Sequence, residues 1–184
     1  MKNVLGVCGS PRRKGNTDIL VSKILEGAKE AGAKTESIFL KKLKIKECNG
    51  CHSCWEGKKC SKRDDMNDLY PKIEEADAIV FGTPVYWYGP TAIMKGFIDR
   101  FVYFNCPENR KKIRGKSAVL AVPFEEDDID AAAPLVTMFE KSFDYVEINL
   151  VGKILAPGVG EKGDILKKPD LLEEAYKLGV EIGG

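Results

Sequence analysis

Near its start the chain reads Val4-Leu5-Gly6-Val7-Cys8-Gly9-Ser10-Pro11-Arg12-Arg13-Lys14-Gly15-Asn16-Thr17, in which an apolar run passes into a polar, glycine-containing turn. Residues 4–7 predict a short buried strand. Beyond the turn, Ile19, Leu20, Ile24 and Leu25 recur at helical spacing, so we expect a helix to begin where the turn ends. The stretch therefore predicts a strand, a loop and a helix, the first unit of an α/β fold.

The same alternation continues to the end of the chain. We expect strands at residues 4–7, 34–40, 78–81, 116–122 and 146–154, and helices near residues 19–25, 65–75, 92–103, 130–143 and 171–182. Five strands separated by helices predict a parallel sheet covered on both faces, because parallel neighbours need crossover connections. We expect residues 1–184 to form a single domain, long enough to bury a core without disulfides.

The first turn, residues 9–17, has the features of an anion site. Free backbone N–H groups and the positive end of a helix would face one small volume there. Ser10, Asn16 and Thr17 can donate side-chain hydrogen bonds, and Arg12 can offer a charged fork to a terminal phosphate. The spacing matches neither a Walker A loop nor Gly-x-Gly-x-x-Gly. The alternative is an ordinary connection in which Asn16 or Thr17 serves only as the N-cap.

An aromatic loop follows the third predicted strand. It reads Gly82-Thr83-Pro84-Val85-Tyr86-Trp87-Tyr88-Gly89-Pro90 and lies where parallel sheets bind ligands, at the carboxyl ends of their strands. Three adjacent aromatic side chains left open to solvent would be unfavourable, so we expect a flat ligand or another subunit to cover them. A subunit interface is the alternative, and both uses can hold together.

Four cysteines, Cys48, Cys51, Cys54 and Cys60, lie within thirteen residues in Cys-Asn-Gly-Cys-His-Ser-Cys-Trp-Glu-Gly-Lys-Lys-Cys. Thiolates at this density predict a metal site, and the compact run suits a cubane iron–sulfur cluster held by four Cys. Zinc also accepts four thiolates, but structural zinc sites usually separate two Cys-x-x-Cys pairs by a longer segment. Zinc and free thiols are the alternatives.

These features together resemble a known family. The phosphate loop, the run Pro84-Val85-Tyr86-Trp87-Tyr88-Gly89-Pro90 and the run Met94-Lys95-Gly96-Phe97-Ile98-Asp99-Arg100 resemble the flavodoxin-like NADPH-dependent FMN reductases, and the four-Cys run is similar to that of the iron–sulfur flavoproteins. The resemblance implies a flavodoxin-like three-layer sandwich with a five-stranded parallel sheet in the order 2-1-3-4-5. It also implies a cysteine-rich cluster loop, residues 46–63, inserted after the second strand.

The resemblance also implies the cofactors, FMN and a [4Fe–4S] cluster, and the residues that bind them. FMN phosphate would be bound by Ser10, Arg12, Lys14, Gly15, Asn16 and Thr17, the ring by Pro84, Val85, Tyr86, Trp87, Tyr88 and Gly89, and the cluster by Cys48, Cys51, Cys54 and Cys60. A third loop, Val122-Pro123-Phe124-Glu125, corresponds to one that contacts the ring. The family further implies a homodimer or homotetramer in which each cluster approaches a flavin across a subunit boundary.

A flavin accepts two electrons and releases them singly, whereas a cluster passes one at a time, so we expect a redox flavoprotein that transfers electrons between a carrier such as ferredoxin and a small acceptor. The cofactors carry that chemistry, and we assign no catalytic residue. Two alternatives remain: an NAD(P)H-dependent FMN or quinone reductase without a working cluster, and a zinc-stabilised flavin-binding module.

Charge and composition bear on partners and location. The net charge of +1 and the lack of a DNA- or RNA-binding motif predict no nucleic-acid partner. No apolar run has membrane-spanning length, and six cysteines in a chain without an export signal favour the cytoplasm. Residues 41–63 contain eight basic and two acidic residues, an excess of six that could steer an acidic carrier. The blander alternative is a solvated loop that shields its thiolates.

Three further residues have expected places. We expect Asp99 and Arg100 to brace a helix surface or a dimer contact, and Cys106 to lie uninvolved in a polar loop.

Overall fold

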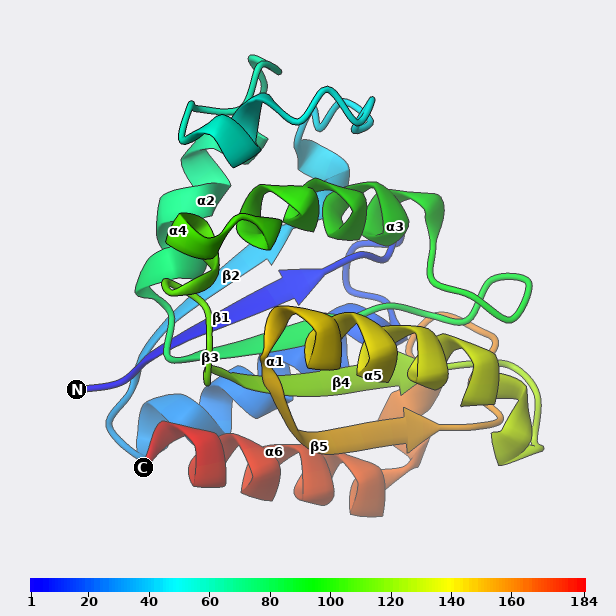
Figure 1. Ribbon diagram of the computed structural model, residues 1–184. Helices are drawn as coiled ribbons and strands as arrows, with labels where there is room; N and C mark the ends of the chain where they lie inside the picture. The colour runs from blue at the N-terminus through cyan, green and yellow to red at the C-terminus, as the bar shows by residue number, and fades with distance from the viewer.

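The computed structural model describes residues 1–184 and contains one parallel sheet of five strands (Figure 1). The strands are β1 (Asn3–Cys8), β2 (Lys34–Phe39), β3 (Ala78–Gly82), β4 (Ser117–Pro123) and β5 (Asn149–Ala156). Their order is β2-β1-β3-β4-β5, and every neighbouring pair is parallel. The predicted order and parallel pairing are confirmed.

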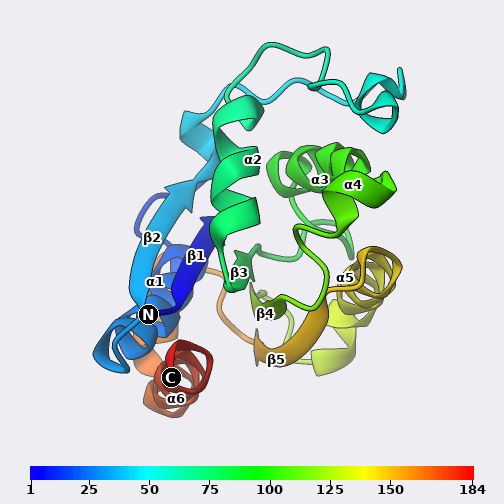
Figure 2. The same ribbon diagram turned by 60° about the vertical axis from the view of Figure 1, so that its left-hand side comes forward.

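Helices cover both faces of the sheet. They are α1 (Asn16–Glu30), α2 (Met66–Glu75), α3 (Ala92–Asp99), the short α4 (Pro107–Arg110), α5 (Ala133–Val146) and α6 (Pro169–Gly183). Figure 2 shows α1 and α6 on one face and α2, α3 and α5 on the other. Each face carries its own apolar core, because strands buried on both sides present side chains to two helical layers. The predicted three-layer sandwich is confirmed.

Helices α1 and α6 pack with their backbones in close contact. A Cβ atom added to Gly179 would lie 2.0 Å from the carbonyl oxygen of Ile24, and one added to Gly27 would lie 2.1 Å from that of Tyr176. Only glycine fits at such separations. This contact fixes α1, and therefore its N-terminus, against the rest of the molecule.

Several predicted boundaries were wrong, and the helix expected over residues 130–143 runs instead from Ala133 to Val146. The strand expected from residue 146 begins at Asn149, because Val146 completes the buried face of α5 and Glu147 ends that helix in the left-handed region, at φ 61°. The helix expected over residues 92–103 is α-helical only to Asp99 and continues as a 3₁₀ helix, Arg100–Asn105. Phe101 and Phe104 are both buried, and their spacing of three residues matches the 3₁₀ repeat.

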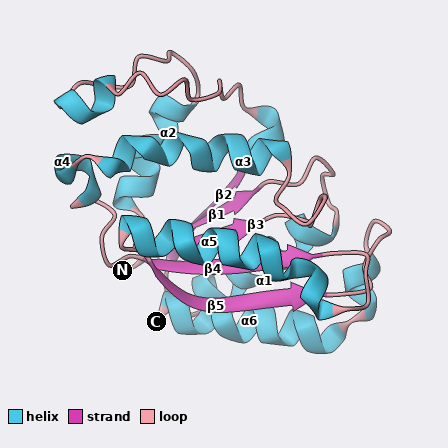
Figure 3. Cartoon of the chain, turned by 45° about the vertical axis from the view of Figure 1, so that its right-hand side comes forward, coloured by secondary structure: helices cyan, strands magenta, loops and turns pink.

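The cysteine-rich segment, residues 40–65 between β2 and α2, follows β2 as predicted and has little regular structure (Figure 3). Its only helical turns are the 3₁₀ turns Leu40–Lys42 and Ser53–Glu56. The segment lies over the outer side of α2 and α3, away from the sheet (Figures 1 and 2). None of the helices combines the length and the apolar character that crossing a membrane requires.

Candidate functional site

A pocket opens at the carboxyl ends of the strands, where the loops after β1, β3 and β4 meet. Its volume is about 110 Å³. It is lined by Ser10, Arg12, Gly15, Asn16 and Thr17 from the first loop, Pro84, Val85 and Tyr86 from the second, Pro123, Phe124 and Glu125 from the third, and Val159, Gly160 and Lys162 from a fourth. The structure thus brings the predicted phosphate loop, part of the aromatic loop and the predicted third loop together.

The N-terminus of α1 points its free backbone groups at this pocket. Gly15 is the N-cap and offers no side chain, so neither Asn16 nor Thr17 caps the helix. The first N–H groups of a helix have no partner within it and carry its positive partial charge. Ser10 is buried beside them, and its hydroxyl accepts a hydrogen bond from the N–H of Arg12 at 3.1 Å. The arrangement suits an anion.

The side chain of Asn16 is already occupied by a distant loop. Its amide nitrogen donates to the carbonyl oxygens of Val159 at 3.0 Å and Glu161 at 2.8 Å. Its amide oxygen accepts from the N–H groups of Gly163 at 2.9 Å and Ile165 at 3.3 Å. Asn16 therefore holds the fourth loop of the pocket in place, and its side chain is not a free phosphate donor.

The two basic residues predicted in the phosphate loop are placed differently from each other. Arg12 lines the pocket, and its guanidinium donates to the carbonyl oxygen of Gly160 at 3.1 Å. Lys14 lies outside the lining, with a left-handed φ of 54° and its N–H bonded to the carboxylate of Asp18. Lys162, which the sequence did not indicate, supplies a second cation to the lining. The glycines around it, at 158, 160 and 163, were the available signal of a functional loop.

The aromatic loop forms a tight hairpin that separates its three aromatic side chains. Tyr86 and Gly89 exchange both backbone hydrogen bonds, at 2.8 and 3.0 Å, around Trp87 and Tyr88. Those two residues have φ of 50° and 60°, a left-handed geometry normally taken by Asn or Gly. Tyr86 lines the pocket, whereas Trp87, Tyr88 and Gly89 do not, and Trp87 is 97% exposed. Strain of this kind persists where the surrounding structure enforces it.

Buried threonines lock the pocket loops to one another. The hydroxyl of Thr91 donates to the carbonyl oxygen of Gly9 at 2.6 Å and accepts from the N–H of Met94 at 3.2 Å. The hydroxyl of Thr83 accepts from the N–H of Thr91 at 3.2 Å. These bonds tie the loop after β3 to the loop after β1, so the two loops that line the pocket are held in fixed relation.

The four predicted cysteine ligands line a second, smaller cavity, beside the 3₁₀ helix that follows α3. Cys51 is exposed, and hydrogen bonds with the hydroxyls of Ser61 and Ser53 lower the pKa of its thiol to about 7. Burial raises the pKa of Cys54 above its ordinary range. No group of three or more His, Cys, Asp or Glu side chains is arranged to hold a metal ion. The thiols thus share one cavity without forming a closed coordination shell.

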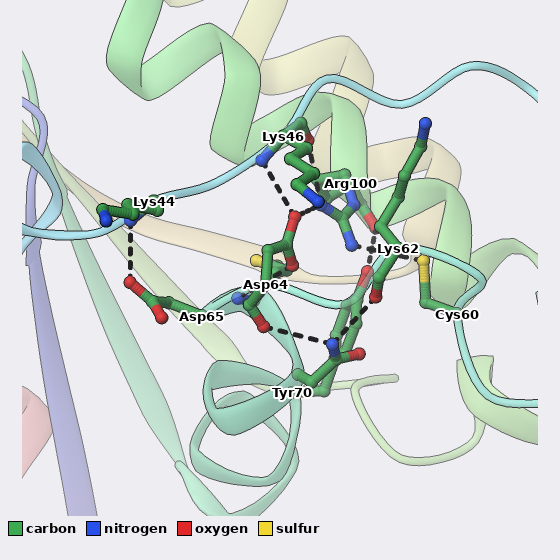
Figure 4. A network of polar contacts seen from close by, with 10 residues as sticks. Lys44, Lys46, Cys60, Lys62, Asp64, Asp65, Tyr70 and Arg100 are labelled. Atoms are coloured by element: carbon green, nitrogen blue, oxygen red, sulfur yellow. Dashed lines mark hydrogen bonds and ion pairs between the residues drawn. The ribbon is translucent and has the colours of Figure 1, made fainter.

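Arg100 lines this cavity and forms a buried charged pair with Asp64 behind it (Figure 4). Arg100 and Asp64 lie 2.6 Å apart, and each side chain is 1% exposed. Burial alone would raise the pKa of Asp64, but hydrogen bonds from Arg100 and from the N–H of Lys46 outweigh it and leave that pKa below its ordinary value. The expectation that Arg100 braces a surface or a dimer contact was wrong, because its guanidinium turns inward to the cysteine segment. Cys106 is also buried and not in an open loop.

Comparison with known proteins agrees with this geometry. Residues 2–149 match the family model of the NADPH-dependent FMN reductases. The chain belongs to this family. An iron–sulfur flavoprotein of Archaeoglobus fulgidus is 32% identical over 180 residues, which cover 97% of this chain and 77% of that protein. One of Methanocaldococcus jannaschii is 42% identical over 97 residues, which cover 53% of this chain and only 50% of that protein.

A solved structure supports the fold. The NAD(P)H:quinone oxidoreductase from Methanothermobacter marburgensis superposes with a TM-score of 0.75 at 19% identity, covering 99% of this chain and 95% of that one. The predicted resemblance to the iron–sulfur flavoprotein branch of the FMN reductase family is confirmed, and the protein is a flavin-dependent oxidoreductase.

Proposed function

We propose that this protein is a redox flavoprotein that binds FMN and a [4Fe–4S] cluster and transfers electrons between a carrier such as ferredoxin and a small acceptor. The observation that carries the proposal is the pairing of two cavities in one chain. One is formed by the uncapped N-terminus of α1 and the aromatic loop, and the other is lined by four cysteines.

FMN fits the first cavity by its chemistry. The N–H groups at the start of α1, the hydroxyls of Ser10 and Thr17, and Arg12 would hold the phosphate. Pro84, Val85 and Tyr86 would contact the ring, while Trp87 and Tyr88 lie outside the pocket lining, where a neighbouring subunit would cover them. The protein contributes binding and orientation, while the redox chemistry belongs to the cofactors.

The cluster fits the second cavity by its donor set. Four cysteines line one cavity, and the buried guanidinium of Arg100 donates a hydrogen bond to the sulfur of one of them, Cys60. The segment that carries them has little regular structure, so drawing Cys48, Cys51, Cys54 and Cys60 together disrupts no sheet or long helix. When bound, the cluster supplies single-electron transfer.

All six cysteines are free, which supports a reducing compartment, the cytoplasm.

A homodimer or homotetramer completes the arrangement. The cysteine segment lies on the outer side of α2 and α3 (Figure 1), whereas the pocket is lined by loops at the carboxyl ends of the strands. A second subunit would bring its cysteine segment towards the pocket of the first and would cover the exposed Trp87. The test is the molar mass of the flavin-loaded protein in solution. A monomer at micromolar concentration would contradict this part of the proposal.

An acidic electron carrier is the partner that the basic segment favours. Lys58 pairs with Glu56 at 2.7 Å, but most of the excess basic residues between 41 and 63 have no acidic partner. Such a surface raises the association rate of an acidic partner at low salt. Reduction by ferredoxin should therefore slow as ionic strength rises, and a flat profile would remove the steering role.

An NAD(P)H-dependent FMN or quinone reductase without a cluster is the second candidate. It is favoured by the family's NADPH-dependent description and by the absence of a closed metal shell among the cysteines. A zinc-stabilised flavin-binding module is the third. Anaerobic purification with iron, sulfide, zinc and flavin assays separates the three.

The decisive experiment compares Cys51→Ala with Cys106→Ala, a buried cysteine outside the proposed ligand set. We expect the wild type to contain about four iron atoms per FMN. Cys51→Ala should lose most of the iron and keep its flavin, whereas Cys106→Ala should keep both. A yellow, iron-free wild type that oxidises NADPH rapidly would favour the second candidate, and failure to bind flavin would remove all three.

A further inference from the structure

We propose that Arg100 is a positioning residue for the iron–sulfur centre, which holds the Cys60 sulfur in place and raises the reduction potential of the cluster by donating a hydrogen bond to it. This inference rests on the proposed function, because it concerns a ligand of the proposed cluster.

The guanidinium of Arg100 contacts three parts of the cysteine segment at once (Figure 4). Its Nη2 donates to the sulfur of Cys60 at 3.2 Å. Its Nη1 donates to the carbonyl oxygen of Lys46 at 2.9 Å and to the Asp64 carboxylate at 2.6 Å. The Arg100 guanidinium therefore joins the residues just before the cysteine run to those just after it.

Asp64 holds the guanidinium of Arg100 in the orientation in which its other nitrogen faces Cys60. Its carboxylate also accepts from the N–H of Lys46 at 2.8 Å and from the N–H of Met66 at 3.2 Å. The hydroxyl of Tyr70 donates to the carbonyl oxygen of Arg100 at 3.3 Å. A buried charge must keep its partners, so the guanidinium cannot swing away to solvent. The donor that faces Cys60 is pre-organised before any metal binds.

The other thiols have weaker or opposite surroundings. Cys51 meets only serine hydroxyls on the exposed side, and the thiol of Cys54 points to the carbonyl oxygen of Val102 at 3.9 Å. Cys60 alone has a fixed cationic N–H donor. Hydrogen bonds to the sulfurs and nearby charge set cluster potentials, and a positive donor favours the more negative, reduced state. Cys60 is therefore the ligand through which this chain raises the reduction potential of the cluster.

The test is an anaerobic redox titration of the reconstituted, FMN-loaded protein, in which EPR measures the fraction of reduced cluster. One electron comes from dithionite in each cluster reduction, and no bond is made or broken. The double variant Arg100→Met/Asp64→Asn removes the donor without leaving a buried charge unpaired. We expect its reduction equilibrium to shift about tenfold toward the oxidised form, which is about 59 mV lower for a one-electron couple.

Two further variants guard the test. Arg100→Lys keeps a positive charge but cannot reach Cys60, Lys46 and Asp64 together, so we expect a smaller shift of about threefold in the same direction. Arg114→Met is the matched control, because Arg114 forms an exposed pair with Glu147. It should leave the potential unchanged. FMN content reports whether each variant is folded.

The outcomes separate the two claims. A loaded double variant with the wild-type potential, whether or not it loses iron faster, would make Arg100 merely structural and overturn the inference. If the double variant holds no iron, the potential of Arg100→Lys decides in the same way. A wild type that binds FMN but takes up no cluster would refute the proposed centre, and this inference with it.

Discussion

The pocket at the strand ends and the cysteine segment are built in different ways. The pocket loops begin at strand ends and are bonded to one another through Thr83, Thr91 and Asn16, so the sheet positions them. The cysteine segment crosses the outer side of α2 and α3 with two 3₁₀ turns, and the buried polar pair in its structure joins Asp64 to Arg100. The first region is formed by the fold itself, whereas the second depends on one ion pair and on the metal that we propose it binds.

This contrast has an energetic side. A pocket whose walls share hydrogen bonds with a buried sheet opens only when the fold opens. A segment with little secondary structure has few backbone hydrogen bonds, so each remaining contact contributes a larger share of its stability. We expect substitutions in the two regions to differ in which property they change, and the predictions below compare matched residues from both.

Arg100→Met should have the greatest consequence. It leaves the Asp64 carboxylate buried without its partner, and breaking a buried ion pair in this way costs about 3–5 kcal/mol of unfolding free energy. Urea unfolding of the flavin-loaded protein measures the loss. Arg114→Met, in an exposed pair with Glu147, should cost less than about 1 kcal/mol. Equal effects of the two substitutions would mean that the pair does not hold the cysteine segment.

Asn16→Ala tests the pocket side. It removes four hydrogen bonds between the first loop and residues 159–165, and at about 0.5–1 kcal/mol for each bond the expected loss of stability is about 2–4 kcal/mol. Asn149→Ala, which removes one exposed bond to the carbonyl oxygen of Gly115, is the control. We expect FMN affinity to fall in the first variant only, while iron content stays unchanged in both. Loss of iron from Asn16→Ala would show that the two regions are coupled.

Apolar strands, glycine turns and helical spacing are local patterns, and they predicted the parallel sheet, whereas the strand order came from the resemblance to a known family. The sequence also predicted the three loops that meet at the pocket. It missed the roles of Asn16 and Arg100, whose partners lie 143 to 149 and 36 to 54 residues away. The sequence does not distinguish a polar side chain that faces water from one that bonds to a distant carbonyl group. Only the tertiary contacts show which of the two roles a residue has. The 3₁₀ helix was missed because its apolar spacing continues that of α3.

Ser10→Ala should weaken FMN binding moderately. The hydroxyl lies buried in the pocket and orders the N–H of Arg12, so its loss removes a phosphate donor and loosens the loop. We expect a fivefold to tenfold rise in the dissociation constant, about 1–1.4 kcal/mol. Fluorescence titration of the flavin-free protein measures it. Ser142→Ala, whose hydroxyl bonds to the carbonyl oxygen of Met138 within α5, should leave the constant unchanged. No change in Ser10→Ala would place the phosphate elsewhere.

The subtlest difference between the two regions is in their thiols. In the sheet, burial raises the pKa of Cys8 to about 12, while in the segment hydrogen bonds with Ser61 and Ser53 lower that of Cys51 to about 7. The thiolate is the reactive form, so in metal-free protein iodoacetamide should modify Cys51 at a rate that rises with pH and levels off above about pH 7, and should leave Cys8 untouched. Ser61→Ala should raise the pKa of Cys51 and slow its modification at pH 7 about fivefold. Ser53→Ala should have a smaller effect, because the bond from Cys51 to Ser61 is the shorter of the two, at 3.0 Å against 3.6 Å. Mass spectrometry of the labelled peptides follows both sites. Modification of Cys8 at the rate of Cys51 would mean that the sheet opens as readily as the segment, against the contrast on which these predictions rest.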